Sequence, residues 1–172
     1  MTHSSSSLIR DVADFPKPGI VFKDITPVLA DGSALASVVA DMASPYSTSG
    51  ITHVAGIEAR GFILAAPVAT ALEAGFVPIR KQGKLPAPCA SIEYALEYGT
   101  DILEIHRDAV GPGDRVLLVD DVIATGGTAE AAIGLIAGLG AEVIALAFYV
   151  ELVFLGGANR LTVPVSALIR YD

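Results

Sequence analysis

Two adjacent carboxylates stand directly before a glycine turn in the stretch VLLVDDVIATGGT, residues 116–128. The acids are Asp120 and Asp121, and an alanine-rich helical pattern follows the turn. Backbone N–H groups at a helix start lack partners within the helix and carry the positive end of its dipole. Glycines let such a backbone approach a phosphate closely, and threonines add hydroxyl donors. The expected phosphate site comprises Ala124, Thr125, Gly126, Gly127 and Thr128.

The two carboxylates require a ligand group other than the phosphate. An ionised aspartate accepts hydrogen bonds, and a sugar diol offers two donors. The stretch has neither the Lys-Ser/Thr pair of a P-loop nor the G-x-G-x-x-G pattern of dinucleotide-binding turns. A ribose 5-phosphate fits better, because it has hydroxyls at one end and a phosphate at the other. We therefore expect Asp120 and Asp121 to face sugar hydroxyls.

Basic side chains follow two other expected strands. Arg60 lies in the turn at residues 58–61, and a guanidinium can clamp two phosphate oxygens. An arginine after a strand is most often only solvated, so its position at a strand's carboxyl end carries the interpretation. A second basic group begins with the last residue of the strand expected at 76–80 and consists of Arg80, Lys81 and Lys84.

Expected strands alternate with expected helices along the chain. Apolar residues at helical spacing follow Asp31, a good N-cap, and predict a helix over 32–43. The run at 115–120 does not alternate and is typical of a strand buried on both faces of a parallel sheet. We predict one α/β domain, 1–172, with a doubly wound, mainly parallel central sheet flanked by helices. Further strands are expected at 51–57, 76–80, 101–106, 142–150 and 164–169, and helices at 62–74, kinked or started late by Pro67, and at 127–139.

Ligands in such sheets bind beyond the carboxyl ends of the strands, so the turns at 58–61, 81–84 and 120–128 should converge.

Three segments lack the hydrophobic periodicity of a helix or a strand. Residues 15–27 are rich in proline and are expected to form an ordered loop. Residues 81–100 are expected to form a long functional loop or lid, and residues 2–7 to be frayed.

The composition excludes several classes of protein. The net charge is −8, whereas general binders of nucleic acids or membrane surfaces need basic faces. Cys89 is the only cysteine, so a disulfide within the chain or a cysteine-cluster metal site is excluded. The first residues lack the apolar core of a signal peptide, and no apolar run is long enough to span a membrane. A cytoplasmic location is expected.

Six blocks of the chain, in order, resemble the adenine phosphoribosyltransferases, which are type I phosphoribosyltransferases. The stretch at 116–128 is similar to their phosphoribosyl pyrophosphate signature. The other blocks are DFPKPGIVFKDITPVL (14–29), EARGF (58–62), RKQGKLP (80–86), LEYGTDILEIHRDA (96–109) and VEL (150–152).

The resemblance implies transfer of the phosphoribosyl group from phosphoribosyl pyrophosphate to adenine, giving AMP and pyrophosphate. It implies Mg²⁺ held through the pyrophosphate and the ribose hydroxyls, with Asp120 and Asp121 as candidate ligands. It assigns Arg60 to the pyrophosphate loop, with Arg80, Lys81 and Lys84 in a similar role. A homodimer is also implied, because in the family some of these basic groups come from the partner subunit.

By the same resemblance, Glu97 and Tyr98 lie at the tip of a flexible catalytic loop, about 81–101, that excludes water on closing. Glu97 is the candidate to take the proton lost from adenine N9 or to orient the base. An N-terminal hood, about 1–30, contributes to the base pocket, where the family commonly has arginine in place of Lys23. The adenine-binding candidates are Val21, Phe22, Lys23 and Leu152.

Two alternatives stay open. A phosphoribosyltransferase for hypoxanthine, guanine or xanthine would present reversed donors and acceptors to a 6-oxo base, and these bonds cannot be placed from sequence. A regulator that binds phosphoribosyl pyrophosphate or a nucleotide as a signal typically carries an added DNA-binding segment. The length and charge of this chain disfavour such a regulator.

Overall fold

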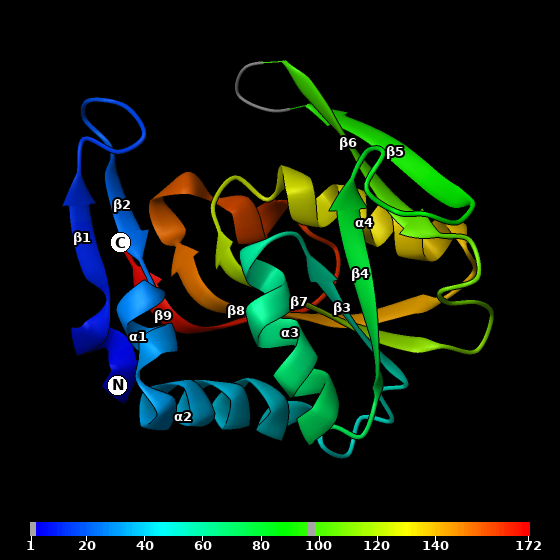
Figure 1. Cartoon of the computed structure of the whole chain (residues 1–172), viewed down its shortest axis with the longest axis horizontal. Coiled ribbons are helices and arrows are strands. Elements are labelled where there is room, and N and C mark those ends of the chain that lie inside the picture. Colours follow the sequence, from blue (N-terminus) through cyan, green and yellow to red (C-terminus); the bar gives the residue numbers. More distant parts are fainter. Residues whose placement is uncertain (1–2, 96–98) are drawn as a thin grey trace.

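The computed structural model describes residues 3–95 and 99–172, which fold around a seven-stranded sheet (Figure 1). The strand order is β5-β6-β4-β3-β7-β8-β9, and β1 and β2 form a separate two-stranded sheet. The strands are β1 (Arg10–Ala13), β2 (Val21–Asp24), β3 (His53–Ile57), β4 (Gly75–Lys81), β5 (Cys89–Ala95), β6 (Thr100–His106), β7 (Arg115–Ile123), β8 (Glu142–Leu152) and β9 (Val165–Tyr171).

The centre of the sheet is parallel, as predicted. Strands β4, β3, β7, β8 and β9 run parallel to their neighbours, whereas β6 pairs antiparallel with β4 and with β5. The central strands are apolar without alternation because both of their faces are covered. Leu117, Leu118 and Val119 of β7 are fully buried.

Helices cover both faces of the sheet, which confirms the doubly wound α/β fold. Leu117 packs in a cluster with residues of α2 (Gly32–Ala43) and α3 (Arg60–Ala71). Its neighbour Leu118 points to the opposite face and packs with α4 (Gly127–Gly138). Asp31 caps α2 by accepting hydrogen bonds from the backbone of its first turn, as predicted. No helix in the described ranges is long and apolar enough to cross a membrane.

The N-terminal segment is more ordered than the sequence predicts. The expectation of frayed residues 2–7 is wrong for the described part, because Ser4–Leu8 forms a 3₁₀ turn. It is held by a buried hydrogen bond between the hydroxyls of Ser5 and Tyr149, 2.7 Å long. The proline-rich loop at 15–27 is shorter than expected, because β2 and α1 (Thr26–Ala30) occupy much of it.

Three other boundaries differ from the predictions. Residues 81–100 are not one long loop, because β5 pairs with β6 along its whole length. Helix α3 begins at Arg60 and contains Pro67, so the late start is wrong. Strand β7 continues to Ile123 because its last residues pair with β8, which places both aspartates inside the strand.

Candidate active site

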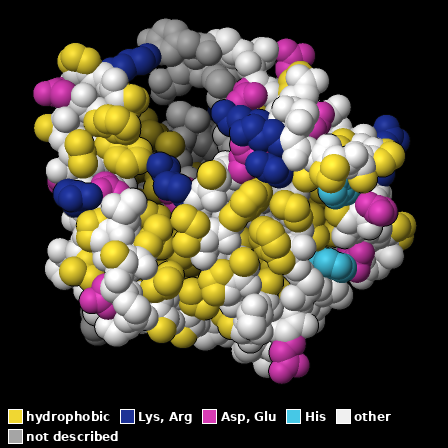
Figure 2. Space-filling model, in the orientation of Figure 1, with side chains coloured by type: hydrophobic (Ala, Val, Ile, Leu, Met, Phe, Trp, Pro, Cys, Tyr) yellow, Lys and Arg dark blue, Asp and Glu magenta, His cyan; other side chains and the backbone are white. Residues whose placement is uncertain are grey.

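A cavity of about 630 Å³ opens at the carboxyl ends of β3, β4 and β7. The three turns expected to converge all contribute to its lining. Figure 2 shows a hollow on this face with basic and acidic side chains beside it. Among the sequence candidates, the cavity is lined by Arg60, Lys81, Lys84, Asp120, Asp121, Ala124, Thr125, Gly126 and Thr128.

The two aspartates occupy different environments within the cavity. Asp121 is 5% exposed, and its carboxylate accepts a hydrogen bond from the Nε of Arg60 in a close ion pair. Oδ1 of Asp120 accepts a hydrogen bond of 2.9 Å from the backbone N–H of Asp121. Burial, and then the neighbouring Asp121 charge, raise the pKa of Asp120 well above its ordinary value. The pair therefore combines one carboxylate that orients a guanidinium with one that holds its proton more tightly.

The start of α3 lies against the acid pair. A Cβ added to Gly61 would be 2.5 Å from Oδ1 of Asp120 and 3.3 Å from the Val119 carbonyl oxygen. Only a residue without a side chain fits this approach. Arg60, the residue before it, is thereby brought within ion-pair distance of Asp121.

The glycine turn has the backbone that phosphate binding requires. Gly126 has φ of +82°, which favours glycine, and α4 begins at the next residue. No side chain of the described residues caps the N-terminus of α4, so its first N–H groups stay open to a ligand. Gly127 lines a second, neighbouring cavity of about 550 Å³. Thr125 lines both cavities.

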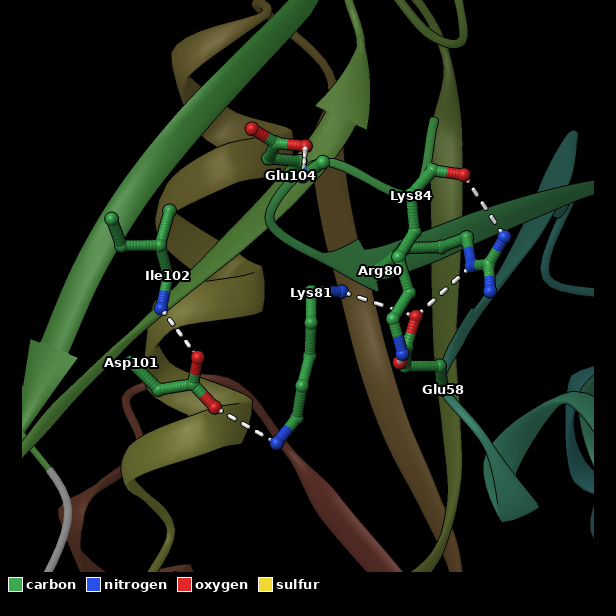
Figure 3. A network of polar contacts seen from close by, with 8 residues as sticks. Glu58, Arg80, Lys81, Lys84, Asp101, Ile102 and Glu104 are labelled. Atoms are coloured by element: carbon green, nitrogen blue, oxygen red, sulfur yellow. Dashed lines mark hydrogen bonds and ion pairs between the residues drawn. The ribbon is translucent and has the colours of Figure 1, made fainter. Parts of the chain in front are cut away.

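Carboxylates of the chain hold the basic cluster in place (Figure 3). Glu58 accepts hydrogen bonds from Nε of Arg80 at 2.9 Å and from Nζ of Lys84 at 2.6 Å. The ammonium of Lys81 pairs with Asp101 at 2.9 Å. Arg80 is not among the described residues that line the cavity, and its guanidinium donates instead to Glu58 and to the Lys84 carbonyl oxygen.

Glu58 is a residue that the sequence interpretation missed. Its side chain is only 7% exposed, and burial alone would raise its pKa. Hydrogen bonds from Lys84, from the Lys81 backbone and from Arg80 outweigh burial and hold the pKa of Glu58 below its ordinary value. The signal was present in the EARG block, where an acid precedes the arginine, but its partners lie more than twenty positions away.

None of the adenine-binding candidates is among the described residues that line the cavity. The Phe22 ring centroid is 5.1 Å from Cζ of Arg60, which links the N-terminal hairpin to the acid pair. The ammonium of Lys23 pairs with Asp11 at 2.7 Å and lies 4.1 Å from the ring centroid of Tyr171. Val21 is 52% exposed, and Leu152 ends β8, partly buried.

Two further candidates fall where the structure gives no description. Glu97 and Tyr98 lie outside the described residues. The strands on either side of them, β5 and β6, contribute Tyr94, Asp101 and Leu103 to the cavity wall. The sequence did not single out Tyr94 or Leu103, because neither belongs to a motif that points to chemistry.

Known proteins that are similar to this chain belong to the family that its sequence blocks resemble. A family model described as phosphoribosyl transferase domain matches residues 28–162. An adenine phosphoribosyltransferase of Rhodopseudomonas palustris (strain BisB5) is 55% identical over 174 residues, covering 99% of this chain and 96% of the relative. One of Methylobacterium sp. (strain 4-46) is 58% identical over 167 residues, covering 95% and 92%.

Solved structures agree with the sequence relatives. The chain superposes on an adenine phosphoribosyltransferase of Rhodothermus marinus with a TM-score of 0.91 at 53% identity, covering 96% of this chain and 95% of the other. The enzyme of Giardia lamblia, complexed with 9-deazaadenine, gives a TM-score of 0.93 at 37% identity over 100% and 99% of the two chains. From its sequence, its fold and the cavity at the ends of its central strands, the chain belongs to the adenine phosphoribosyltransferases.

Proposed function

We propose that this enzyme transfers the 5-phosphoribosyl group of phosphoribosyl pyrophosphate to adenine in purine salvage, releasing AMP and pyrophosphate. The observation that carries the proposal is the convergence of an acid pair, a glycine turn and a basic group in one cavity. Each of the three suits a different part of phosphoribosyl pyrophosphate. The family relationship supplies adenine as the acceptor.

The acid pair and the turn would bind the ribose 5-phosphate portion. Asp120 and Asp121 line the cavity beside the turn that begins α4, so hydroxyls and a 5-phosphate on one sugar can reach both. The helix N-terminus favours the phosphate charge, while the carboxylates accept hydrogen bonds from the hydroxyls. Asp121 has a second role in this proposal, because it also orients Arg60.

The basic group would bind the pyrophosphate. Lys81 and Lys84 line the cavity together with Arg60, and Arg80 donates a hydrogen bond to the Lys84 carbonyl oxygen. Their carboxylate partners, Glu58 and Asp101, hold these side chains at the cavity. Charge on the departing pyrophosphate grows as the bond to the sugar breaks, so fixed cations at this position stabilise the transition state.

The donors present fit a Mg²⁺ ion that arrives with its substrate. Mg²⁺ is commonly bound by one or two carboxylates together with substrate phosphates. Asp120 and Asp121 supply that number of carboxylates. Within residues 3–95 and 99–172 no group of three or more His, Cys, Asp or Glu side chains could form an all-protein cage. Such an ion would neutralise pyrophosphate charge, while the chain positions the sugar.

The base would lie between the N-terminal hairpin and the end of β8. Phe22 supplies an aromatic face near Arg60, and Leu152 an apolar side chain. A purine suits an apolar slot with a few directed hydrogen bonds. Lys23, with its charge shared between Asp11 and Tyr171, is assigned a supporting position in this pocket.

Glu97 and Tyr98 are assigned to the loop that closes over the substrates, and Glu97 to the proton of adenine N9 or to orientation of the base. The resemblance of the LEYG block to the family supports these roles. Full turnover in both Glu97→Gln and Glu97→Ala would contradict the assignment of Glu97.

A homodimer in the cytoplasm is also proposed. Helix α3 and strand β4 present an apolar face beside the cavity, which Figure 2 shows as a hydrophobic area. Ile63 and Phe76 are 44% and 37% exposed, and the Phe76 ring packs edge-on against Phe62. An exposed apolar patch of this kind marks an interaction surface, and a second copy would bring its own basic groups close to the site.

One assay tests the proposed reaction. The protein is mixed with Mg²⁺, phosphoribosyl pyrophosphate and, in turn, adenine, hypoxanthine, guanine or xanthine, and nucleotide formation is followed. AMP from adenine, with little product from the 6-oxo bases, is the expected result. If nucleotide forms only with another base, that base and not adenine is the substrate. Nucleotide binding without any product would favour a regulator that binds phosphoribosyl pyrophosphate or a nucleotide as a signal.

A further inference from the structure

The segment after β8 touches the backbone of the glycine turn. A Cβ added to Gly157 would lie 2.2 Å from the Ala124 carbonyl oxygen and 2.8 Å from the Gly126 nitrogen. The contact is mutual, because a Cβ on Gly126 would lie 2.5 Å from the Gly157 carbonyl oxygen. Two stretches of backbone therefore meet with no side chain between them, and Gly157 is buried at the contact.

Arg160 extends the same contact to α4. Its guanidinium donates to the Thr125 carbonyl oxygen at 3.4 Å and pairs with Glu130, in the first turn of α4, at 2.9 Å. Both side chains of the pair are more than half exposed, so the ion pair adds little to stability. What the arginine does supply is a link between the turn and the helix that follows it.

We propose that Gly157 and Arg160 are positioning residues for the 5-phosphate site. This inference rests on the proposed binding of a ribose 5-phosphate at the turn 124–128. Phosphate recognition by backbone N–H groups depends on their directions, and a short turn has few contacts of its own to fix them. The 153–160 segment supplies the missing support, through close backbone contact at Gly157 and a side-chain link at Arg160.

The arrangement also connects the sites proposed for the two ends of the product, AMP. Strand β8 ends at Leu152, a candidate for the base pocket, and the chain reaches Gly157 five positions later. One continuous segment thus runs from the adenine side to the back of the 5-phosphate turn. AMP, the proposed product, would span both positions, so this segment contributes to both parts of its proposed site.

The test compares two ligands that are proposed to bind at different parts of the cavity. Ribose 5-phosphate requires the turn, whereas pyrophosphate with Mg²⁺ uses the basic group elsewhere in the cavity. Binding of each is measured by calorimetry to the unmodified protein and to Gly157→Ala. Gly138→Ala is the matched control, since a methyl group there meets no described atom within 4 Å.

Gly157→Ala is expected to weaken ribose 5-phosphate binding on the order of tenfold or more, because the turn must move away from the new methyl group. Pyrophosphate binding and the Gly138→Ala control should be unchanged. Wild-type affinity for ribose 5-phosphate in folded Gly157→Ala, or an equal loss for pyrophosphate, would overturn the inference.

If Gly157→Ala does not fold, the same binding measurements on Arg160→Ala and Arg160→Lys test the positioning role. A selective loss of ribose 5-phosphate affinity in Arg160→Ala, partly restored in Arg160→Lys, supports the positioning role. No selective loss in Arg160→Ala overturns it. A different outcome concerns the proposed function itself: unmodified protein that binds pyrophosphate but not ribose 5-phosphate would show that the turn is not a 5-phosphate site.

Discussion

Replacing Gly61 with alanine should impair catalysis through Asp120. The new Cβ would stand 2.5 Å from Oδ1 of Asp120, whereas ordinary contact begins near 3.4 Å, so one of the two must move by at least 3.4 − 2.5 = 0.9 Å. The clash is hard to relieve, since the same oxygen accepts the Asp121 backbone N–H and the Val119 carbonyl oxygen lies only 3.3 Å from the new Cβ. Misplacement of a positioning group by about 1 Å can lower the rate on the order of 100-fold.

The expected result is a fall of about 10- to 100-fold in kcat/KM for phosphoribosyl pyrophosphate, equivalent to about 1.4 to 2.7 kcal/mol of transition-state stabilisation. Initial rates of AMP formation are measured with adenine saturating and phosphoribosyl pyrophosphate varied. Gly138→Ala, which meets open space among the described residues, controls for the change of residue type. Thermal unfolding of each variant separates a local displacement from general loss of structure.

A double-mutant cycle tests whether Gly61→Ala acts through Asp120. If Gly61→Ala acts by displacing the Asp120 carboxylate, it should cost much less in an Asp120→Ala background, because the group to be displaced is already gone. Equal losses in both backgrounds would refute the proposed route. So would a Gly61→Ala enzyme with the kinetics of the unmodified protein.

Three further predictions concern the acids and the N-terminal anchor. Asp120→Asn combined with Asp121→Asn should weaken phosphoribosyl pyrophosphate binding in a titration while the melting temperature is kept; unchanged affinity would contradict the ribose assignment. The pKa of Glu58 is lowered in the folded state, so its stabilising effect is complete above the ordinary pKa of 4.5 and is lost as pH falls through the lower folded value. Glu58→Gln should therefore reduce the free energy of unfolding by about 1 kcal/mol at pH 7 and by less at strongly acidic pH, and an equal reduction at both would contradict this linkage. Ser5→Ala should cost about 1 kcal/mol in denaturant unfolding, because it leaves the buried Tyr149 hydroxyl unpaired, and adding Tyr149→Phe should recover part of that loss; no recovery would argue against the hydrogen bond as the cause.

The central fold was predictable because its signals are local and strong. The strand at 115–120 is apolar on both faces, and the helix at 127–139 follows directly from a glycine turn, so both were placed within a few residues. What failed was the end of β7. The strand was expected to end at Asp120, because a second acid and a glycine turn follow, yet backbone pairing with β8 continues through Ile123 and does not depend on side-chain polarity.

The antiparallel pairs were missed for a different reason. Strand β5 lies at the sheet edge and follows a stretch punctuated by prolines and lysines, so its sequence reads as a loop. Its order comes from β6, through pairs such as Ser91 with Glu104. Likewise β1 and β2 depend on each other across the proline-rich turn between them. A strand whose position depends on pairing with one neighbouring strand has little hydrophobic pattern in its own sequence.

The site was predictable in its parts but not in its charge pairing. Sequence placed the acids, the turn and the cations at strand ends, and topology then required them to converge. Which acid holds which cation depends on side chains more than twenty positions apart, as for Glu58 with Lys84 or Arg60 with Asp121. No local pattern contains that information.

These ion pairs explain why acidic side chains occur within an anion site. Asp121 was expected to face the sugar and Glu58 was not singled out, yet each holds cations that suit pyrophosphate. The Asp121 and Glu58 side chains are each 7% exposed, whereas those of Arg60 and Lys84 are about half exposed. A buried carboxylate without a partner would be costly, so these ion pairs are favoured, and they keep the basic group in place inside an otherwise acidic protein. Pyrophosphate can then bind by sharing or exchanging the partners of Arg60 and Lys84. The adjacent acids and the anion site therefore support each other, because the acids fix the position of the charges that the anion needs.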